Sequence, residues 1–108
     1  MEVLRYITFS RKDVFGEWLA NLTNPRAMAK IIVRIDRLAA GNFGDCKPLR
    51  DGVWELRIDW GAGYRVYYAL AGRTSVVLLC GGDKRKQSAD IKRAVECWND
   101  YQLRTSSS

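Results

Sequence analysis

Basic side chains that could bind a phosphate recur in residues 53–86, at Arg57, Arg65 and the run Lys84-Arg85-Lys86. A guanidinium is a planar fork suited to gripping a phosphate through two hydrogen bonds, and an ammonium adds a point charge. Alternating apolar and polar residues over 53–60, followed by two further apolar stretches, predict three consecutive antiparallel strands. If these strands pair as a meander, the cations lie near one another and form an anion site.

Arg57 and Arg65 are the most informative pair in this stretch. A glycine-containing turn at residues 61–63 joins their strands, so the two arginines are expected to lie almost opposite each other. Like charges directly across a ladder are destabilising unless a counter-ion is present. Glu55 or Asp59 could supply that counter-ion, and so could a bound phosphate. A solvent-facing or carboxylate-paired Arg65 is the simpler alternative.

The run at residues 84–86 follows Gly81-Gly82 and precedes Ser88, a good helix N-cap. A charge run is usually a solvated loop, but loop amides and a helix start also favour an anion. Aromatic residues lie between the cations, at Trp60, Tyr64, Tyr67 and Tyr68. We expect most of them to be core or cross-strand residues, with Trp60 as the candidate for an exposed ring that stacks on a base.

The elements that must position these residues can be assigned along the chain. A strand is expected over 3–9, a helix over 11–22 capped by Ser10, and a second helix from Asn24-Pro25 to Gly41. Residues 42–50 are predicted to form a loop. Strands follow over 53–60, 64–70 and 74–80, and a last helix covers 88–103 with Ser88 as its cap.

The resulting order, β-α-α-β-β-β-α, predicts an α+β fold. We expect a twisted antiparallel sheet covered on one face by helices, with a helical hairpin before the meander and a helix after it. Residues 1–104 are expected to form a single domain, and residues 105–108 a frayed polar tail.

Composition limits the classes of function. The chain has 108 residues, a net charge of +6 and a pI near 9.5, which favours nucleic acid or a strongly acidic protein as partner, although solubility alone could explain the charge. No apolar run is long enough to span a bilayer, and the first residues lack the features of a secretion signal. We therefore expect a cytoplasmic protein with no membrane partner.

Cysteine and histidine content narrows the chemistry further. The three cysteines, Cys46, Cys80 and Cys97, are widely spaced, and there is no histidine, so a zinc site is not expected. We expect buried free thiols, no metal and no cofactor. Ser-His and Cys-His nucleophile systems are excluded, so acid–base chemistry would have to come from Lys, Arg, Tyr, Asp or Glu.

Three blocks of sequence carry a resemblance to a known family: RKDVFGEWLANL, PLRDGVWELRIDWGAGYRVYY and CGGDKRKQSADIKRA. With these blocks the chain resembles the RelE/ParE superfamily, the toxins of type II toxin–antitoxin modules. It is most similar to the branch of addiction module killer proteins, which includes phage Gp49-like and HigB-like toxins. The likeness covers nearly the whole chain.

The resemblance implies a microbial RNase fold and an activity. RelE-like members are metal-independent endoribonucleases that cleave mRNA in the ribosomal A site, where the 2′-hydroxyl attacks its adjacent phosphate. On this basis Arg65 would stabilise the phosphorane and Lys84 would bind phosphate. Arg57 would stabilise charge or, less easily, take a proton. Arg85 would support the leaving 5′-oxygen. RNA-binding roles are assigned to Lys86, Gln87, Trp60, Lys47 and Arg50.

Two positions depart from the family pattern. Ile91 stands where RelE has a tyrosine, and Glu55 stands where it has a strand lysine. Loss of a general acid or base typically costs 10²–10⁴-fold in rate. The proton transfers would therefore be slower or reassigned, for instance to Glu55 or Lys84.

Two alternatives to the ribosome-dependent nuclease remain open. One is a ParE-like inhibitor of DNA gyrase, which shares the fold without nuclease activity, and the other is a non-catalytic RNA-binding domain. The resemblance also implies partners: a cognate helix-turn-helix antitoxin, mRNA and the ribosome, with operator DNA contacted only through the antitoxin complex. The antitoxin would cover the basic cleft or displace the last helix.

Overall fold

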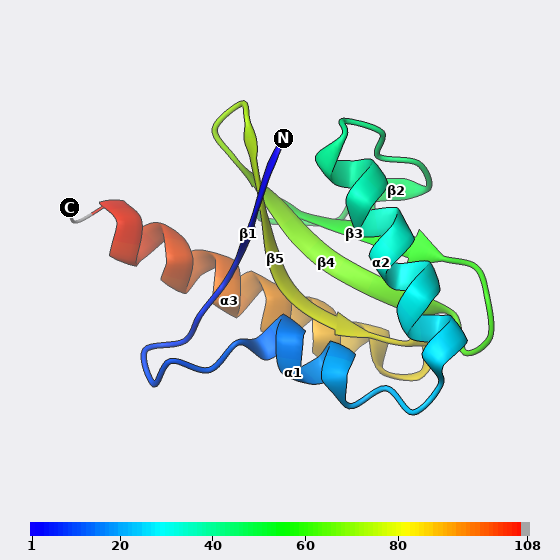
Figure 1. Ribbon diagram of the computed structural model, residues 1–108. Helices are drawn as coiled ribbons and strands as arrows, with labels where there is room; N and C mark the ends of the chain where they lie inside the picture. The colour runs from blue at the N-terminus through cyan, green and yellow to red at the C-terminus, as the bar shows by residue number, and fades with distance from the viewer. Residues whose placement is uncertain (107–108) are drawn as a thin grey trace.

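A computed structural model describes residues 1–106, which form a five-stranded sheet with three α-helices (Figure 1). The predicted α+β class is confirmed, and the last two residues of the predicted tail lie outside the described residues. A short 3₁₀ helix, η1, precedes the last α-helix. The elements are β1 (Glu2–Arg5), α1 (Val14–Ala20), α2 (Pro25–Ala39), β2 (Cys46–Pro48), β3 (Val53–Ile58), β4 (Tyr64–Ala71), β5 (Ser75–Gly82), η1 (Lys84–Lys86) and α3 (Gln87–Ser106).

The strands follow the order β1-β5-β4-β3-β2. The antiparallel meander of β3, β4 and β5 is confirmed. The expectation of a wholly antiparallel sheet is wrong, because β1 pairs in parallel with β5. Strand β1 lies at the edge of the sheet beside β5, and the two strands run in the same direction.

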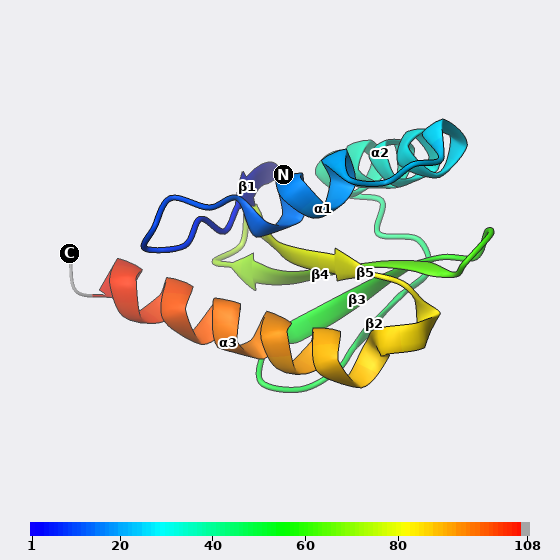
Figure 2. The same ribbon diagram turned by 90° about the horizontal axis from the view of Figure 1, so that it is seen from below.

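Helices cover both faces of the sheet, so the prediction of one covered face is wrong (Figure 2). Helices α1 and α2 lie on one face and α3 on the other. Each face has its own buried core: Phe15, Ile31 and Leu38 pack with Leu56 and Val66 on the first. On the second, Ala94, Val95, Cys97 and Trp98 of α3 pack with Tyr67, Val77 and Leu79. The alternation of β3 therefore separates two interiors, and its polar face lies beneath α3.

The segment between β1 and α1 differs from the prediction. Strand β1 ends at Arg5, and helix α1 begins at Val14, so neither the strand over 3–9 nor the helix over 11–22 has the expected length. Asp13, and not Ser10, is the N-cap, since its carboxylate accepts a hydrogen bond from the Gly16 amide at 2.9 Å. Arg11 has a φ of 67°, a left-handed conformation that interrupts any helix here.

The second helix confirms its predicted start. Asn24 is the N-cap, Pro25 is the first helical residue, and the Asn24 side chain accepts a hydrogen bond from the Arg26 amide at 2.9 Å. The predicted loop over 42–50 is partly wrong, because it contains strand β2, which pairs with β3. A three-residue strand carries too little periodicity to be detected in a sequence.

The last connection also differs. Gly81 and Gly82 lie inside β5, and η1 leads directly into α3. Asp83, and not Ser88, caps this stretch, because its carboxylate accepts a hydrogen bond from the Arg85 amide at 2.9 Å. Among residues 1–106, no helix has the length and apolar character needed to cross a membrane.

Candidate functional site

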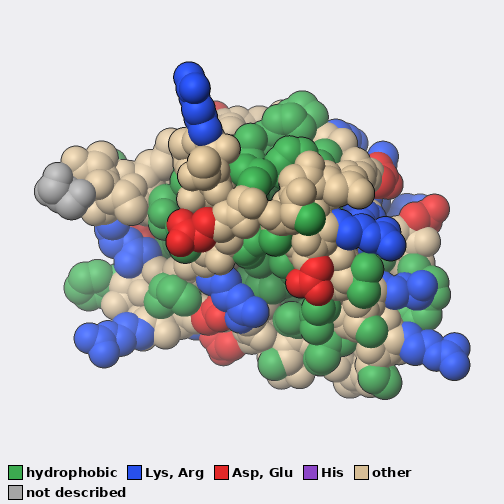
Figure 3. Space-filling model, turned by 45° about the horizontal axis from the view of Figure 1, so that its top comes forward, with side chains coloured by type: hydrophobic (Ala, Val, Ile, Leu, Met, Phe, Trp, Pro, Cys, Tyr) green, Lys and Arg blue, Asp and Glu red, His purple; other side chains and the backbone are tan. Residues whose placement is uncertain are grey.

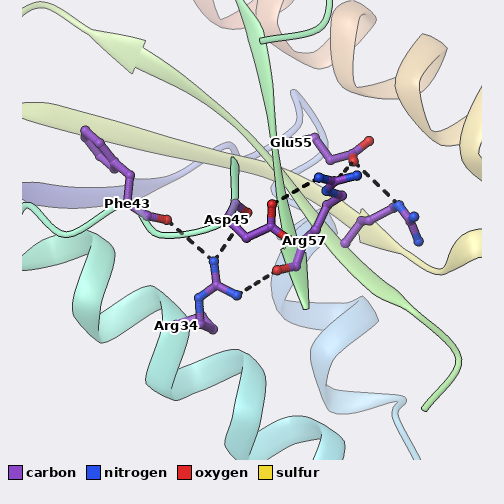
Figure 4. A network of polar contacts seen from close by, with 6 residues as sticks. Arg34, Phe43, Asp45, Glu55 and Arg57 are labelled. Atoms are coloured by element: carbon purple, nitrogen blue, oxygen red, sulfur yellow. Dashed lines mark hydrogen bonds and ion pairs between the residues drawn. The ribbon is translucent and has the colours of Figure 1, made fainter. Parts of the chain in front are cut away.

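The two arginines of the meander lie where the sequence predicts them. Arg57 of β3 is directly opposite Arg65 of β4 in the antiparallel register. Glu55 is their common counter-ion: its Oε1 lies 3.9 Å from Nε of Arg57 and 3.6 Å from Nε of Arg65 (Figure 4). Of the two carboxylates proposed from the sequence as counter-ions, Glu55 is the one that lies within ion-pair distance of both guanidinium groups.

The three charged side chains are exposed to solvent to different extents. The side chain of Glu55 is 1% exposed, that of Arg65 12% and that of Arg57 42%. Tyr67 lies opposite Glu55 in the ladder and is fully buried. Glu55 Oε1, the two arginine Nε atoms and the Tyr67 hydroxyl form no hydrogen bond in the described structure. Burial, and then the nearby Glu55 carboxylate, raise the pKa of Tyr67.

Two further residues hold Arg57, and the sequence did not single out either of them. Asp45 Oδ1 lies 3.1 Å from Nη2 of Arg57. From α2, Arg34 donates from Nη1 to the Arg57 carbonyl at 2.6 Å and from Nη2 to the carbonyls of Asp45 and Phe43 (Figure 4). Asp45 comes next to Arg57 because β2 pairs with β3, and β2 was predicted to be a loop.

A pocket of about 280 Å³ opens over this cluster. It is formed by the end of β3, the start of β4, the turn between them, and the first residue of η1. Gly63 in the turn has a φ of 72° and accepts a hydrogen bond from Nη1 of Arg65 at 2.5 Å. The residues that line the pocket are Asp45, Arg57, Ile58, Asp59, Gly63, Tyr64, Arg65 and Lys84.

The pocket brings together three of the predicted site residues, Arg57, Arg65 and Lys84. Their three positive charges face the carboxylates of Asp45 and Asp59, with the Glu55 carboxylate behind. Charge is therefore balanced, and an arriving anion must compete with carboxylates. The Arg57–Asp45 pair is the exposed one, at 42% and 49% exposure, and exposed pairs contribute only about 0–1 kcal/mol. Asp45 is thus easily displaced from Arg57.

The other cations predicted near η1 lie outside the pocket. Arg85 is 81% exposed and pairs with Asp83, its Nη2 lying 3.0 Å from Oδ2. The same arginine, through its side-chain and backbone hydrogen bonds, lowers the pKa of Asp83. Lys86 and Gln87 line a shallow surface at the start of α3 that also includes Arg85 and shares Lys84 with the pocket. Arg85 is therefore placed on the outer surface of η1, beside the pocket and not within it.

Three residues predicted to bind RNA are spread over other parts of the surface. Trp60 packs against the core under α2, with the Lys30 Nζ 5.4 Å from the centre of its ring. Lys47 is exposed on the edge strand β2, opposite Glu55. Arg50 pairs with Asp51 at 3.3 Å. None of the three lines the pocket.

At the position of the family tyrosine, Ile91 packs half-buried against the core under α3. A different phenol, that of Tyr64, belongs to the pocket lining. The sequence had grouped Tyr64 with core and cross-strand aromatics. Its position directly before Arg65 on the predicted strand was the feature of the sequence that could have indicated a place in the site.

The cysteines are free thiols, as predicted, with Cys80 and Cys97 buried and Cys46 half-buried. Burial raises the pKa of Cys80 to about 12, so this thiol is not an activated nucleophile. Within the described part of the chain, no group of three or more metal-ligating side chains is present.

Comparison with known proteins identifies relatives over most of the chain. Residues 17–96 match a family described as "Phage derived protein Gp49-like (DUF891)". A protein of Haemophilus influenzae (strain ATCC 51907 / DSM 11121 / KW20 / Rd), described as "Uncharacterized protein", is 58% identical over 80 residues, which are 74% of this chain and 81% of that protein. The segment matched to the family includes every residue of the pocket.

Proposed function

The chain belongs to the family of phage-derived Gp49-like proteins, a family associated with the toxins of toxin–antitoxin modules, and from that premise we propose that it is a toxin that cleaves RNA. We place it in the HigB-like branch of the RelE/ParE superfamily, as a metal-independent endoribonuclease that cuts mRNA on the ribosome. One observation carries the proposal: Arg57 and Arg65 lie side by side, fixed by a buried carboxylate, at the floor of a pocket.

The proposed reaction is attack of a ribose 2′-hydroxyl on the adjacent phosphate. An O2′–P bond forms, the P–O5′ bond breaks, the hydroxyl loses a proton and the leaving oxygen gains one. The guanidinium groups of Arg57 and Arg65 stabilise the extra charge on the phosphorane. Asp45 and Asp59 are the carboxylates at the pocket that can accept the proton, and the Lys84 ammonium can donate one.

We assign Glu55 a positioning role within this mechanism. A carboxylate that is 1% exposed and set between two guanidinium groups is poorly placed to meet a ribose hydroxyl. It pairs with both arginines at their Nε atoms, while a terminal nitrogen of Arg57 pairs with Asp45 and one of Arg65 donates to the Gly63 carbonyl. The family's association with toxins also implies a cognate antitoxin, which we propose is a helix-turn-helix protein that covers this pocket or displaces α3.

Primer extension on a defined mRNA in a reconstituted translation system tests the activity. We expect cuts within translated codons. Lys84→Ala and Arg65→Lys should each lower the cutting rate by about 10²-fold or more, because each removes a donor to the phosphorane or leaving group. Lys84 is exposed, so its variant should remain folded, which circular dichroism can check. Arg73→Ala, at the exposed β4–β5 turn, is the matched control and should cut normally.

The charge balance of the pocket favours a second candidate, a ParE-like inhibitor of DNA gyrase without nuclease activity. Two results together would support this inhibitor and contradict the nuclease. The mRNA would stay intact in the translation assay, and the purified chain would abolish supercoiling by gyrase. Unchanged cutting by a folded Lys84→Ala and by Arg65→Lys would show that the pocket is not the active site.

A further inference from the structure

A second hollow, of about 420 Å³, lies on the other side of the β3 end, between α2 and the β3–β4 turn. It shares two residues, Ile58 and Asp59, with the pocket over Arg57 and Arg65, so the two hollows adjoin at the end of β3. We call this second hollow the α2 groove. Its lining is Ala29, Lys30, Val33, Arg34, Arg37, Ile58, Asp59 and Trp60.

The α2 groove differs from the pocket in its charge. Three cations of α2, Lys30, Arg34 and Arg37, face a single carboxylate, Asp59. In Figure 3 several Lys and Arg side chains gather on the side of the molecule where α2 lies, with apolar and acidic groups between them. A surplus of positive charge along a hollow is the electrostatic requirement for a polyanion.

Two of the three cations of α2 form no ion pair within residues 1–106. Arg34 is committed to three backbone carbonyls, those of Phe43, Asp45 and Arg57. Lys30 and Arg37 are exposed, and within residues 1–106 neither forms an ion pair. Lys30 instead lies over the Trp60 ring, with its Nζ 5.4 Å from the ring centre.

We propose that the α2 groove binds the single-stranded RNA that flanks the phosphate in the pocket, with Trp60 stacking on one base and Lys30 and Arg37 contacting two phosphates. This proposal rests on the proposed function, because it assumes that the pocket binds a phosphate of an RNA strand. The two residues that the hollows share place them next to each other at the end of β3. The combination of an aromatic ring with cations that form no ion pair is that of single-strand binding sites.

The free energies of the two interactions explain how a base can reach the Trp60 ring. An exposed lysine over an aromatic face contributes about 0.5–1 kcal/mol, whereas stacking of a base on such a ring is worth about 1–3 kcal/mol. A base therefore displaces Lys30 from Trp60 at a net gain. The freed ammonium stays within the groove, where it can move to a phosphate of the same strand. The lysine thus occupies the stacking surface only while RNA is absent.

Binding can be tested without cleavage. The probe is a fluorescein-labelled eight-nucleotide RNA with 2′-O-methyl riboses throughout, which lacks the attacking hydroxyl. Anisotropy titrations over a range of salt concentrations compare the wild type with a Lys30→Gln/Arg37→Gln variant. Removal of two phosphate contacts should reduce the slope of log Kd against log salt by about 1.4, since each contact contributes about 0.7. Arg73→Gln/Lys92→Gln removes the same charge at exposed positions of the β4–β5 turn and α3, and should leave the slope unchanged.

A second variant reports on the stacked ring. Trp60→Leu should weaken binding about 10-fold, whereas Trp60→Phe should retain most of the affinity and abolish the part of the tryptophan fluorescence quenching that comes from Trp60. Equal slopes for the two double variants, or undiminished binding by a folded Trp60→Leu, would overturn the proposal. Loss of antitoxin binding with normal RNA binding would instead assign the groove to the antitoxin.

The outcomes separate this proposal from the proposed function. If the chain binds the methylated RNA through the α2 groove but leaves translated mRNA intact, the groove proposal stands and the nuclease proposal is wrong. If both groove variants cut mRNA normally, the nuclease proposal stands and the groove proposal is wrong.

Discussion

The two faces of the sheet differ in what they bury. Beneath α1 and α2 the buried set is apolar apart from the hydroxyl of Tyr68. Beneath α3 the interior is apolar around Trp98 and Val77, but it becomes charged toward the start of β4, where Glu55 is the one buried charged residue among residues 1–106. The interior of the first face leaves no buried side-chain polar atom without a hydrogen bond among the described residues. The second accepts the cost of buried polar atoms without hydrogen bonds, and that cost falls at the candidate active site.

The two glycines of β5 provide the largest contrast between the faces. A Cβ at Gly81 would overlap the ring of Trp18 in α1, and a Cβ at Gly82 would overlap the Asp90 carboxylate of α3. An indole packed between an apolar core and its neighbours cannot move away, whereas a carboxylate at the end of a short side chain can rotate. We expect Gly81→Ala to lower the free energy of unfolding by about 3 kcal/mol and Gly82→Ala by about 1 kcal/mol or less. Urea unfolding of both variants measures this difference, and equal losses would contradict it.

The buried carboxylate gives an intermediate effect. Glu55→Gln removes the negative charge between Arg57 and Arg65, which leaves two like charges directly opposite each other. We expect a loss of about 2 kcal/mol in the free energy of unfolding, the scale of leaving a buried polar group without its partner, and partial recovery in added phosphate. Asp51→Asn, which breaks the exposed pair with Arg50, is the control and should change stability by less than about 0.5 kcal/mol. A loss in Glu55→Gln no larger than in the control would show that the arginines do not depend on this carboxylate.

Two adjacent tyrosines sharpen the comparison at the smallest scale. Tyr67 faces α3, and its buried hydroxyl has no hydrogen-bond partner in the described structure. Tyr68 faces α2, and burial, then interaction with the Cys46 side chain, raise the pKa of its hydroxyl. Tyr67→Phe should therefore be neutral or raise the free energy of unfolding by up to about 1 kcal/mol, while Tyr68→Phe should lower it by about 1 kcal/mol. Thermal or urea unfolding decides, and a destabilised Tyr67→Phe would mean that solvent satisfies its hydroxyl.

Local patterns predicted the parts of the structure that depend on neighbours in sequence. The meander and the opposition of Arg57 and Arg65 follow from alternation and from a short turn, since the turn fixes the register on both sides. Glu55 as counter-ion follows from the same alternation, because it shares a face with Arg57. The cap at Asn24 is likewise a property of a few adjacent residues.

Several of the errors arise from contacts between distant segments. An amphipathic helix has an apolar side, but nothing in that pattern states which face of a sheet it covers, so the position of α3 could not be predicted. Asp45 entered the site only because β2 pairs with β3. Arg85 was assigned to the site with Lys84, yet the two neighbouring side chains on η1 lie in different surroundings.

The parallel pairing of β1 has a consequence for the synthesis of this protein. Ser75 donates a hydrogen bond to Glu2 across 73 residues, so β1 has no partner until β5 has left the ribosome. The core beneath α3 closes later still, because α3 follows β5 in the chain. Pairing between such distant segments is slow to form and leaves apolar strands exposed in the meantime. The pocket between β3, β4 and η1 therefore takes shape only near the end of translation, when the whole sheet is available to hold it.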